Sequence, residues 1–106
     1  MESQYSVLFF DNVKNFIATL PNEDQGKING IVTAIESGEF KSLYIKTLKT
    51  SIKELIIKKY RFVFFIHKNT FYFMRAFIKK TAKTPKIEIK NAEKLYKKIL
   101  KIINNQ

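Results

Sequence analysis

The most informative segment of the chain for its fold is Tyr60-Arg-Phe-Val-Phe-Phe-Ile-His67, followed by Lys68-Asn69 and then Thr70-Phe-Tyr-Phe-Met-Arg-Ala-Phe77. Both halves are rich in aromatic and β-branched residues, which predicts two β-strands. Lys68 and Asn69 predict the hairpin turn between them, because Asn favours the positive φ angle that tight turns need. The hairpin holds six of the ten Phe residues of the chain, so we expect it at the centre of the sheet.

The surrounding sequence predicts a single α+β domain over residues 1–106, with the element order β-α-α-β-β-β-α. Further strands are expected at 5–10 and 52–58, and helices at 11–20, at 22–37 and from about 85 to 103. Segment 40–50 has no clean period and indicates a basic connector or an irregular strand. We expect a twisted antiparallel sheet with the two N-terminal helices on one face. The C-terminal helix is expected at its side or swung out.

The ends of the predicted helices carry their own signals. Asp11 or Asn12 can cap the first helix, and Gly38 can end the second. Thr84 can cap the last helix, with Pro85 in its first turn.

The charges are unevenly distributed along the chain. Residues 1–40 hold two Lys and six acidic residues, a net charge of −4, whereas residues 41–106 hold 18 Lys or Arg and three Glu, a net charge of +15. We therefore expect one strongly positive face that attracts RNA, DNA or an acidic protein segment. The alternative is a lysine-rich surface that is merely solvated.

Composition excludes several classes of site. The chain has no Cys and one His, which leaves no disulfide framework, thiolate centre or zinc site. Its three Gly residues form no phosphate-binding loop, and three acidic residues after position 40 are too few for a two-metal site. No cofactor is expected. No apolar run approaches about 18 residues and no secretory signal is visible, so we expect a cytoplasmic protein without a membrane partner.

A set of cations on the predicted strands and at their ends can support metal-free RNA cleavage: Lys53, Arg61, Arg75, Lys79 and Lys80. Attack by a 2′-hydroxyl builds negative charge on the scissile phosphate, which fixed guanidinium and ammonium groups stabilise. Glu54 is the acid of this set, and a carboxylate or amine of shifted pKa can transfer the protons. The structural alternatives are solvated cations, a cross-strand ion pair for Glu54 and an exposed strand end for His67.

The length of the hairpin turn sets the position of Arg61. A two-residue turn pairs His67 with Thr70 and places Arg61 opposite Ala76, with Arg75 on the other face. A three-residue turn brings Arg61 opposite Phe77 and onto the face of Arg75. Either register leaves Arg61 near the strand end that leads to Lys79 and Lys80.

Three motifs within residues 52–92 carry a resemblance to a known family. They are Ile52-Lys-Glu-Leu55, Tyr60-Arg-Phe-Val-Phe-Phe65, and Phe77-Ile-Lys-Lys-Thr-Ala-Lys-Thr-Pro85 followed by Glu88-Ile-Lys-Asn-Ala92. In this order they resemble the phage-derived branch of the HigB toxins within the RelE/ParE superfamily.

This resemblance implies the toxin of a type II toxin–antitoxin module, a ribosome-dependent endoribonuclease that cleaves mRNA and is inhibited by a HigA-like helix-turn-helix antitoxin. It implies catalytic roles for Arg61, Lys80, Glu54 and Lys79. Further RNA contacts are expected from Lys53, Arg75, His67, Lys83 and Lys86. RelE has a tyrosine soon after the basic pair, where this chain has Thr84, Pro85 and Lys86, so Glu54, Lys80 or His67 must take over the acid–base role.

Two other functions remain open from the sequence. One is inhibition of DNA gyrase, as in the ParE branch, which shares the fold and catalyses nothing. The other is a phage-derived nucleic-acid-binding module that binds RNA or DNA without cutting it.

Overall fold

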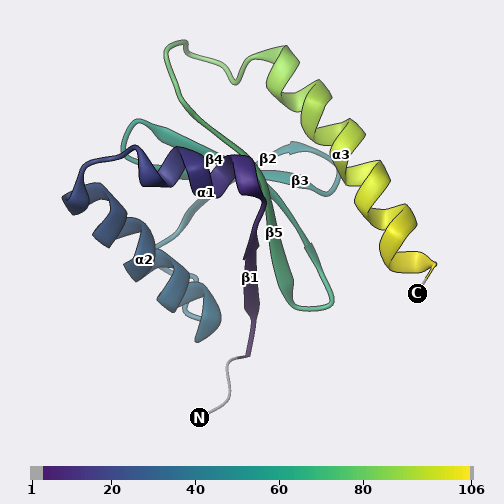
Figure 1. Cartoon of the computed structure of the whole chain (residues 1–106), viewed down its shortest axis with the longest axis horizontal. Helices are drawn as coiled ribbons and strands as arrows, with labels where there is room; N and C mark the ends of the chain where they lie inside the picture. The colour runs from purple at the N-terminus through teal and green to yellow at the C-terminus, as the bar shows by residue number, and fades with distance from the viewer. Residues whose placement is uncertain (1–3, 106) are drawn as a thin grey trace.

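The computed structural model describes residues 4–105, which form a five-stranded sheet with helices on both faces (Figure 1). In chain order the elements are β1 (Ser6–Phe9), α1 (Asp11–Ala18), α2 (Asn22–Glu36), β2 (Tyr44–Lys49), β3 (Ile52–Ile57), β4 (Tyr60–His67), β5 (Thr70–Ile78) and α3 (Lys86–Asn104). The α+β class is confirmed.

The sheet differs from the expected one in two respects. Its strand order is β1-β5-β4-β3-β2, and β1 pairs with β5 in parallel while the other pairs are antiparallel. Segment 40–50 contains a fifth strand, β2, which the predicted element order lacked. All but one of its residues are exposed, because β2 is the edge strand of the sheet, and this removes the apolar alternation that predicts strands.

The two faces of the sheet have separate cores. Under α1 and α2 lies a cluster that includes Val13, Ile28, Ile35, Phe62 and Phe73. Under α3 lies a second cluster that includes Ile52, Val63, Phe65, Ala92 and Ile99. The C-terminal helix therefore lies on the opposite face from the N-terminal pair, as Figure 1 shows.

The hairpin turn has two residues, as one of the two predicted registers requires. Lys68 and Asn69 have φ angles of 46° and 63°, and His67 pairs with Thr70. Positive φ at both central residues is typical of the type I′ turn that matches strand twist.

A β-bulge in β5 nevertheless changes the register beyond the turn. Phe64 pairs with Phe73 but Val63 pairs with Arg75, so Met74 is an extra residue on β5. The side-chain amide of Asn12 donates a hydrogen bond of 3.0 Å to the carbonyl of Met74. Arg61 consequently lies opposite Phe77, and Arg75 shares its face, a combination that the sequence had linked to a three-residue turn.

The predicted helix ends are partly wrong. α2 does end where Gly38 adopts a φ of 78°. The residues before α1 and α3 are Phe10 and Pro85, and neither helix has a side-chain cap. Asn12 and Thr84 use their side chains in tertiary hydrogen bonds instead.

Candidate active site

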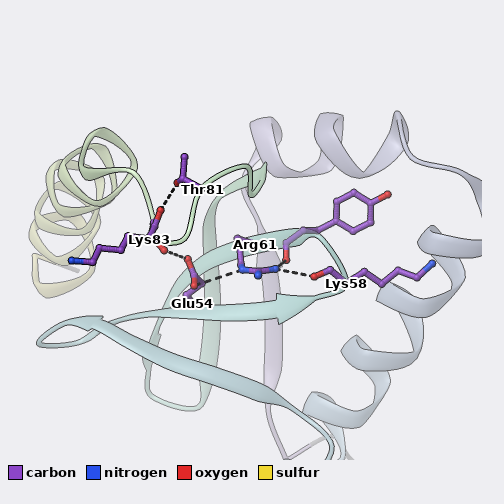
Figure 2. A network of polar contacts seen from close by, with 7 residues as sticks. Glu54, Lys58, Arg61, Thr81 and Lys83 are labelled. Atoms are coloured by element: carbon purple, nitrogen blue, oxygen red, sulfur yellow. Dashed lines mark hydrogen bonds and ion pairs between the residues drawn. The ribbon is translucent and has the colours of Figure 1, made fainter.

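The Glu54 carboxylate lies at the centre of the candidate site, on the face of the sheet that α3 covers. Its side chain is fully buried, and the hydroxyl of Thr84 donates a hydrogen bond of 2.5 Å to its Oε2 (Figure 2). Its Oε1 lies 3.9 Å from Nε of Arg61, which is an ion-pair distance but too long for a hydrogen bond. Within residues 4–105, neither of these two atoms has a hydrogen-bond partner. The site therefore sets a buried carboxylate beside a half-buried guanidinium, and both groups have unused hydrogen-bonding capacity.

Arg61 is held from both sides. Its Nη1 donates to the carbonyls of Lys58 and Tyr60 at 2.9 and 3.0 Å, while its Nε faces Glu54 (Figure 2). The exposed fraction of the Arg61 side chain is 14%. This arrangement orients one planar guanidinium at the end of the sheet where the β3–β4 turn lies. A fixed guanidinium is the kind of group that stabilises charge on a phosphate.

Lys79 and Lys80 follow β5 at the same end of the sheet. The amide of Lys79 donates a hydrogen bond of 2.9 Å to the carbonyl of Lys59, and Arg61 pairs with Phe77 two residues before Lys79. Lys59 and Lys80 are exposed. The structure thus brings Arg61 and the Lys79–Lys80 pair to one end of the sheet, together with Lys59, which the sequence analysis did not single out.

The segment between β5 and α3 passes over Glu54. Its hydroxyls form two hydrogen bonds, from Thr81 to the carbonyl of Lys83 at 2.6 Å and from Thr84 to Glu54. The side chain of Lys83 points away from Glu54 and Arg61 in Figure 2. Lys83 and Lys86 are both exposed. We call the exposed lysines of this end, Lys59, Lys80, Lys83 and Lys86, together with the half-buried Lys79, the basic end.

Three of the residues that were expected to contact RNA either lie away from Glu54 and Arg61 or already form an ion pair within the protein. Lys53 pairs with Phe64, which belongs to the core under α1 and α2, so it lies on the opposite face from Glu54. His67 lies at the hairpin end of β4, six residues and about 20 Å from Arg61. Arg75 shares the face of Arg61, but its Nε forms an ion pair of 2.5 Å with Glu88 in the first turn of α3.

A second charged cluster lies on the other side of the β3–β4 turn. Asp24 of α2 accepts hydrogen bonds of 2.5 Å from both Lys58 and the hydroxyl of Tyr60. The hydrogen bonds from Lys58 and Tyr60 hold the pKa of Asp24 below its usual value. The bond to Asp24 raises the pKa values of Lys58 and Tyr60. Asp24 lies in the first turn of α2, where an acidic residue also suits the positive end of the helix.

Two residues of the site had roles that local patterns could not indicate. Thr84 precedes a helix and was expected to cap it, although the residue that its hydroxyl contacts is 30 positions away. Lys59 belongs to a turn and becomes part of the basic end only through its pairing with Lys79. Within residues 4–105, no group of three or more His, Cys, Asp or Glu side chains is placed to share a metal ion.

Comparison with known protein families assigns this chain to one of them. A model of the family described as Phage derived protein Gp49-like (DUF891) matches residues 15–97, more than half of the chain. The chain belongs to this family. A search of curated proteins found no match.

Solved structures share the fold at low sequence identity. One is the RelB-RelE antitoxin-toxin complex from Methanococcus jannaschii, with a TM-score of 0.59 and 17% identity over 67% of this chain and 88% of the other. Another is the toxin-antitoxin complex RelBE2 from Mycobacterium tuberculosis, with a TM-score of 0.56 and 13% identity over 71% of this chain and 98% of the other. The Gp49-like protein therefore has a RelE-like fold. None of the helices in its described residues has the length and apolarity needed to cross a membrane.

Proposed function

We propose that this Gp49-like protein is the toxin of a type II toxin–antitoxin module and cleaves mRNA on the ribosome without a metal ion. The family match and the RelE-like fold support a place in the RelE/ParE superfamily. The observation that carries the proposal is the oriented Arg61 beside buried Glu54, at the end of the sheet where Lys79 and Lys80 lie. This combination suits a phosphate that gains negative charge during 2′-hydroxyl attack.

In this proposal the residues of the site divide the work. Arg61 stabilises the charge that develops on the scissile phosphate, and Lys79 and Lys80 lower the energy of bringing that phosphate to the site. Glu54 is enclosed, so it acts by holding the Arg61 guanidinium in place. Proton transfer by Glu54 itself requires the segment between β5 and α3 to move away, since that segment covers the carboxylate through Thr84.

The proposed partner is a helix-turn-helix antitoxin of the HigA type. Two similar solved structures are antitoxin–toxin complexes, which supports an antitoxin partner. An acidic or amphipathic segment over the basic end would cover the proposed phosphate site and neutralise its charge. Residues 1–40 carry a net negative charge, so the surface that they form is less suitable for binding an acidic segment.

Mapping RNA ends in cells tests the proposal directly. After a brief pulse of expression, we expect growth to stop and new 5′ ends to appear within mRNA coding regions. Arg61→Ala is the inactive comparison and Lys27→Ala, at an exposed position of α2, is the active one. DNA breaks with intact mRNA would refute mRNA cleavage and indicate inhibition of DNA gyrase instead. Continued growth with intact mRNA would leave a protein that binds nucleic acid without cutting it.

A further inference from the structure

Tyr44 stands apart from the other aromatic residues. Its exposed fraction is 75%, and the next most exposed aromatic side chain in the described residues is that of Phe40, at 38%. Most aromatic side chains in this protein pack in the two cores or against them. Aromatic rings stabilise a fold mainly through the area that they bury, and the exposed ring of Tyr44 buries little of its area. Burial in the core therefore does not account for an aromatic residue at this position.

The sheet register places Tyr44 in line with the candidate active site. Tyr44 pairs with Ile56, Ile56 with Arg61, and Arg61 with Phe77, so these four side chains form one cross-strand row. Paired residues of antiparallel strands project from the same face, and adjacent strands lie about 4.8 Å apart. Tyr44 therefore lies about 10 Å from Arg61 along the sheet, on the same face.

The neighbouring row adds charge beside this ring. Lys46 is exposed and pairs with Glu54, which places it on the same face as Tyr44 and one row further along the strand. Ile56, which lies between Tyr44 and Arg61 in this row, is half-buried, so α3 does not fully cover this part of the sheet. An exposed ring flanked by cations is the arrangement with which proteins bind single-stranded nucleic acid: the ring stacks on a base and the cations bind the backbone.

We propose that Tyr44 is a stacking platform for a base of single-stranded RNA, one nucleotide away from the phosphate held by Arg61. This inference rests on the proposed function for the identity of the RNA but not for the stacking itself. The ring provides the contact and the hydroxyl is dispensable. Tyr44→Phe should therefore bind RNA like the parent chain, whereas Tyr44→Ala should bind about 5- to 100-fold more weakly.

A fluorescent residue at this position makes the contact directly visible. The chain has no Trp, so Tyr44→Trp introduces a single indole that retains the stacking surface. The matched control is Ile45→Trp, because Ile45 is 41% exposed but pairs with Leu55, which belongs to the core under α1 and α2, on the other face of the sheet. The probe is a short 2′-O-methyl RNA, which lacks the attacking hydroxyl and cannot be cleaved by the proposed reaction.

We expect saturable quenching of the Tyr44→Trp emission by the RNA at low salt and little quenching of Ile45→Trp. Equal quenching in both variants, or absence of RNA binding by the parent chain, overturns the inference. So does a Tyr44→Ala variant that binds RNA normally, including one that loses only its affinity for a protein partner. Quenching without mRNA cleavage in cells would instead refute the proposed function and leave the platform standing.

Discussion

At the scale of single residues, the site depends on how one buried carboxylate is satisfied. Glu54 is fully buried, yet the only hydrogen bond that the structure shows to its carboxylate comes from Thr84, and its attraction to Arg61 acts across 3.9 Å. A buried charge that loses a partner retains its desolvation penalty. Replacements around Glu54 should therefore cost more than their exposure alone suggests.

Thr84→Val removes the hydroxyl and keeps the shape of the side chain. We expect unfolding free energy to fall by about 1–3 kcal/mol, the usual cost of leaving a buried acceptor unsatisfied. Thr81→Val is the control, because the Thr81 hydroxyl is exposed and bonds only to the nearby carbonyl of Lys83. Urea denaturation of both variants makes the measurement. Equal losses for the two would show that Thr84 does not stabilise Glu54.

Arg61→Ala tests the proposed electrostatic role in cleavage. We expect single-turnover cleavage to fall by about two to three orders of magnitude, the usual loss for one charge-stabilising donor. Ribosome affinity should fall much less, because the cations of the basic end share the binding. Cleavage and binding are measured in parallel.

The Arg61 experiment needs a control for folding, since the replacement leaves Glu54 without its cation. Circular dichroism and a melting curve give the temperature range in which the variant is folded. Arg61→Lys keeps the charge but not the planar fork, so it should be intermediate in activity. A folded Arg61→Ala variant that cleaves normally, or whose whole deficit lies in binding, would exclude Arg61 from the reaction.

At the level of helices and strands, charged contacts connect α2 and α3 to the sheet. Asp24 joins α2 to the β3–β4 turn through Lys58 and Tyr60. On the other face, Lys49 of β2 forms an ion pair of 2.9 Å with Glu93 of α3, and Arg75 pairs with Glu88. The Asp24 contacts join α2 to the end of the sheet that carries the candidate site, while the other two ion pairs join α3 to the far end of β2 and to the middle of β5.

The Asp24 cluster should make stability depend on pH at both extremes. The pKa of Asp24 is lowered, so its contribution is present above its unfolded pKa and is lost as the pH falls below about 4. The pKa values of Lys58 and Tyr60 are raised, so their contributions are lost as the pH rises above about 10. Asp24→Asn should therefore lower the melting temperature at neutral pH by several degrees.

Melting curves from about pH 2.5 to about pH 11.5 for the parent chain and Asp24→Asn measure this dependence. The difference between them should shrink at both ends of the range. Glu39→Gln, at an exposed position after α2 and in none of the ion pairs found among residues 4–105, serves as the control. A difference that stays constant with pH would mean that Asp24 stabilises the fold by packing alone.

At the scale of the whole molecule, the charge asymmetry along the sequence becomes an asymmetry between faces. The helices α1 and α2, which cover one face, belong to the acidic part of the chain, while α3 on the other face carries six exposed lysines. The basic end runs from the β3–β4 turn and the end of β5, which lie beside each other, along the segment that leads to α3. A long polyanion would meet this side of the molecule first.

Binding to single-stranded RNA should therefore weaken steeply with salt. If the five lysines of the basic end each contact one phosphate, the slope of log affinity against log salt is about −3.5. Affinity then falls roughly a hundredfold between about 50 and 200 mM salt. Lys80→Gln should reduce the slope by about 0.7, whereas Lys27→Gln on α2 should leave it unchanged. Affinity that is unchanged over this range would contradict the electrostatic account.

Features that depend on neighbouring residues could be predicted from the amino-acid sequence. The aromatic hairpin with its turn at Lys68 and Asn69, the end of α2 at Gly38 and the basic second half of the chain all follow from local propensity and composition. The length of the turn stayed open between two and three residues. These features predict the α+β class, whereas the choice of Glu54, Arg61, Lys79 and Lys80 as catalytic candidates rests on the charged strand residues together with the resemblance to the HigB toxins.

Only the tertiary structure decided how these candidates are arranged. The bulge at Met74 brings Arg75 onto the face of Arg61, and the register of β2 places Tyr44 in the same row. The bonds from Asn12 to the bulge and from Thr84 to Glu54 join residues 62 and 30 positions apart. Such contacts depend on how whole elements pack, and a short stretch of sequence contains only one of the two partners.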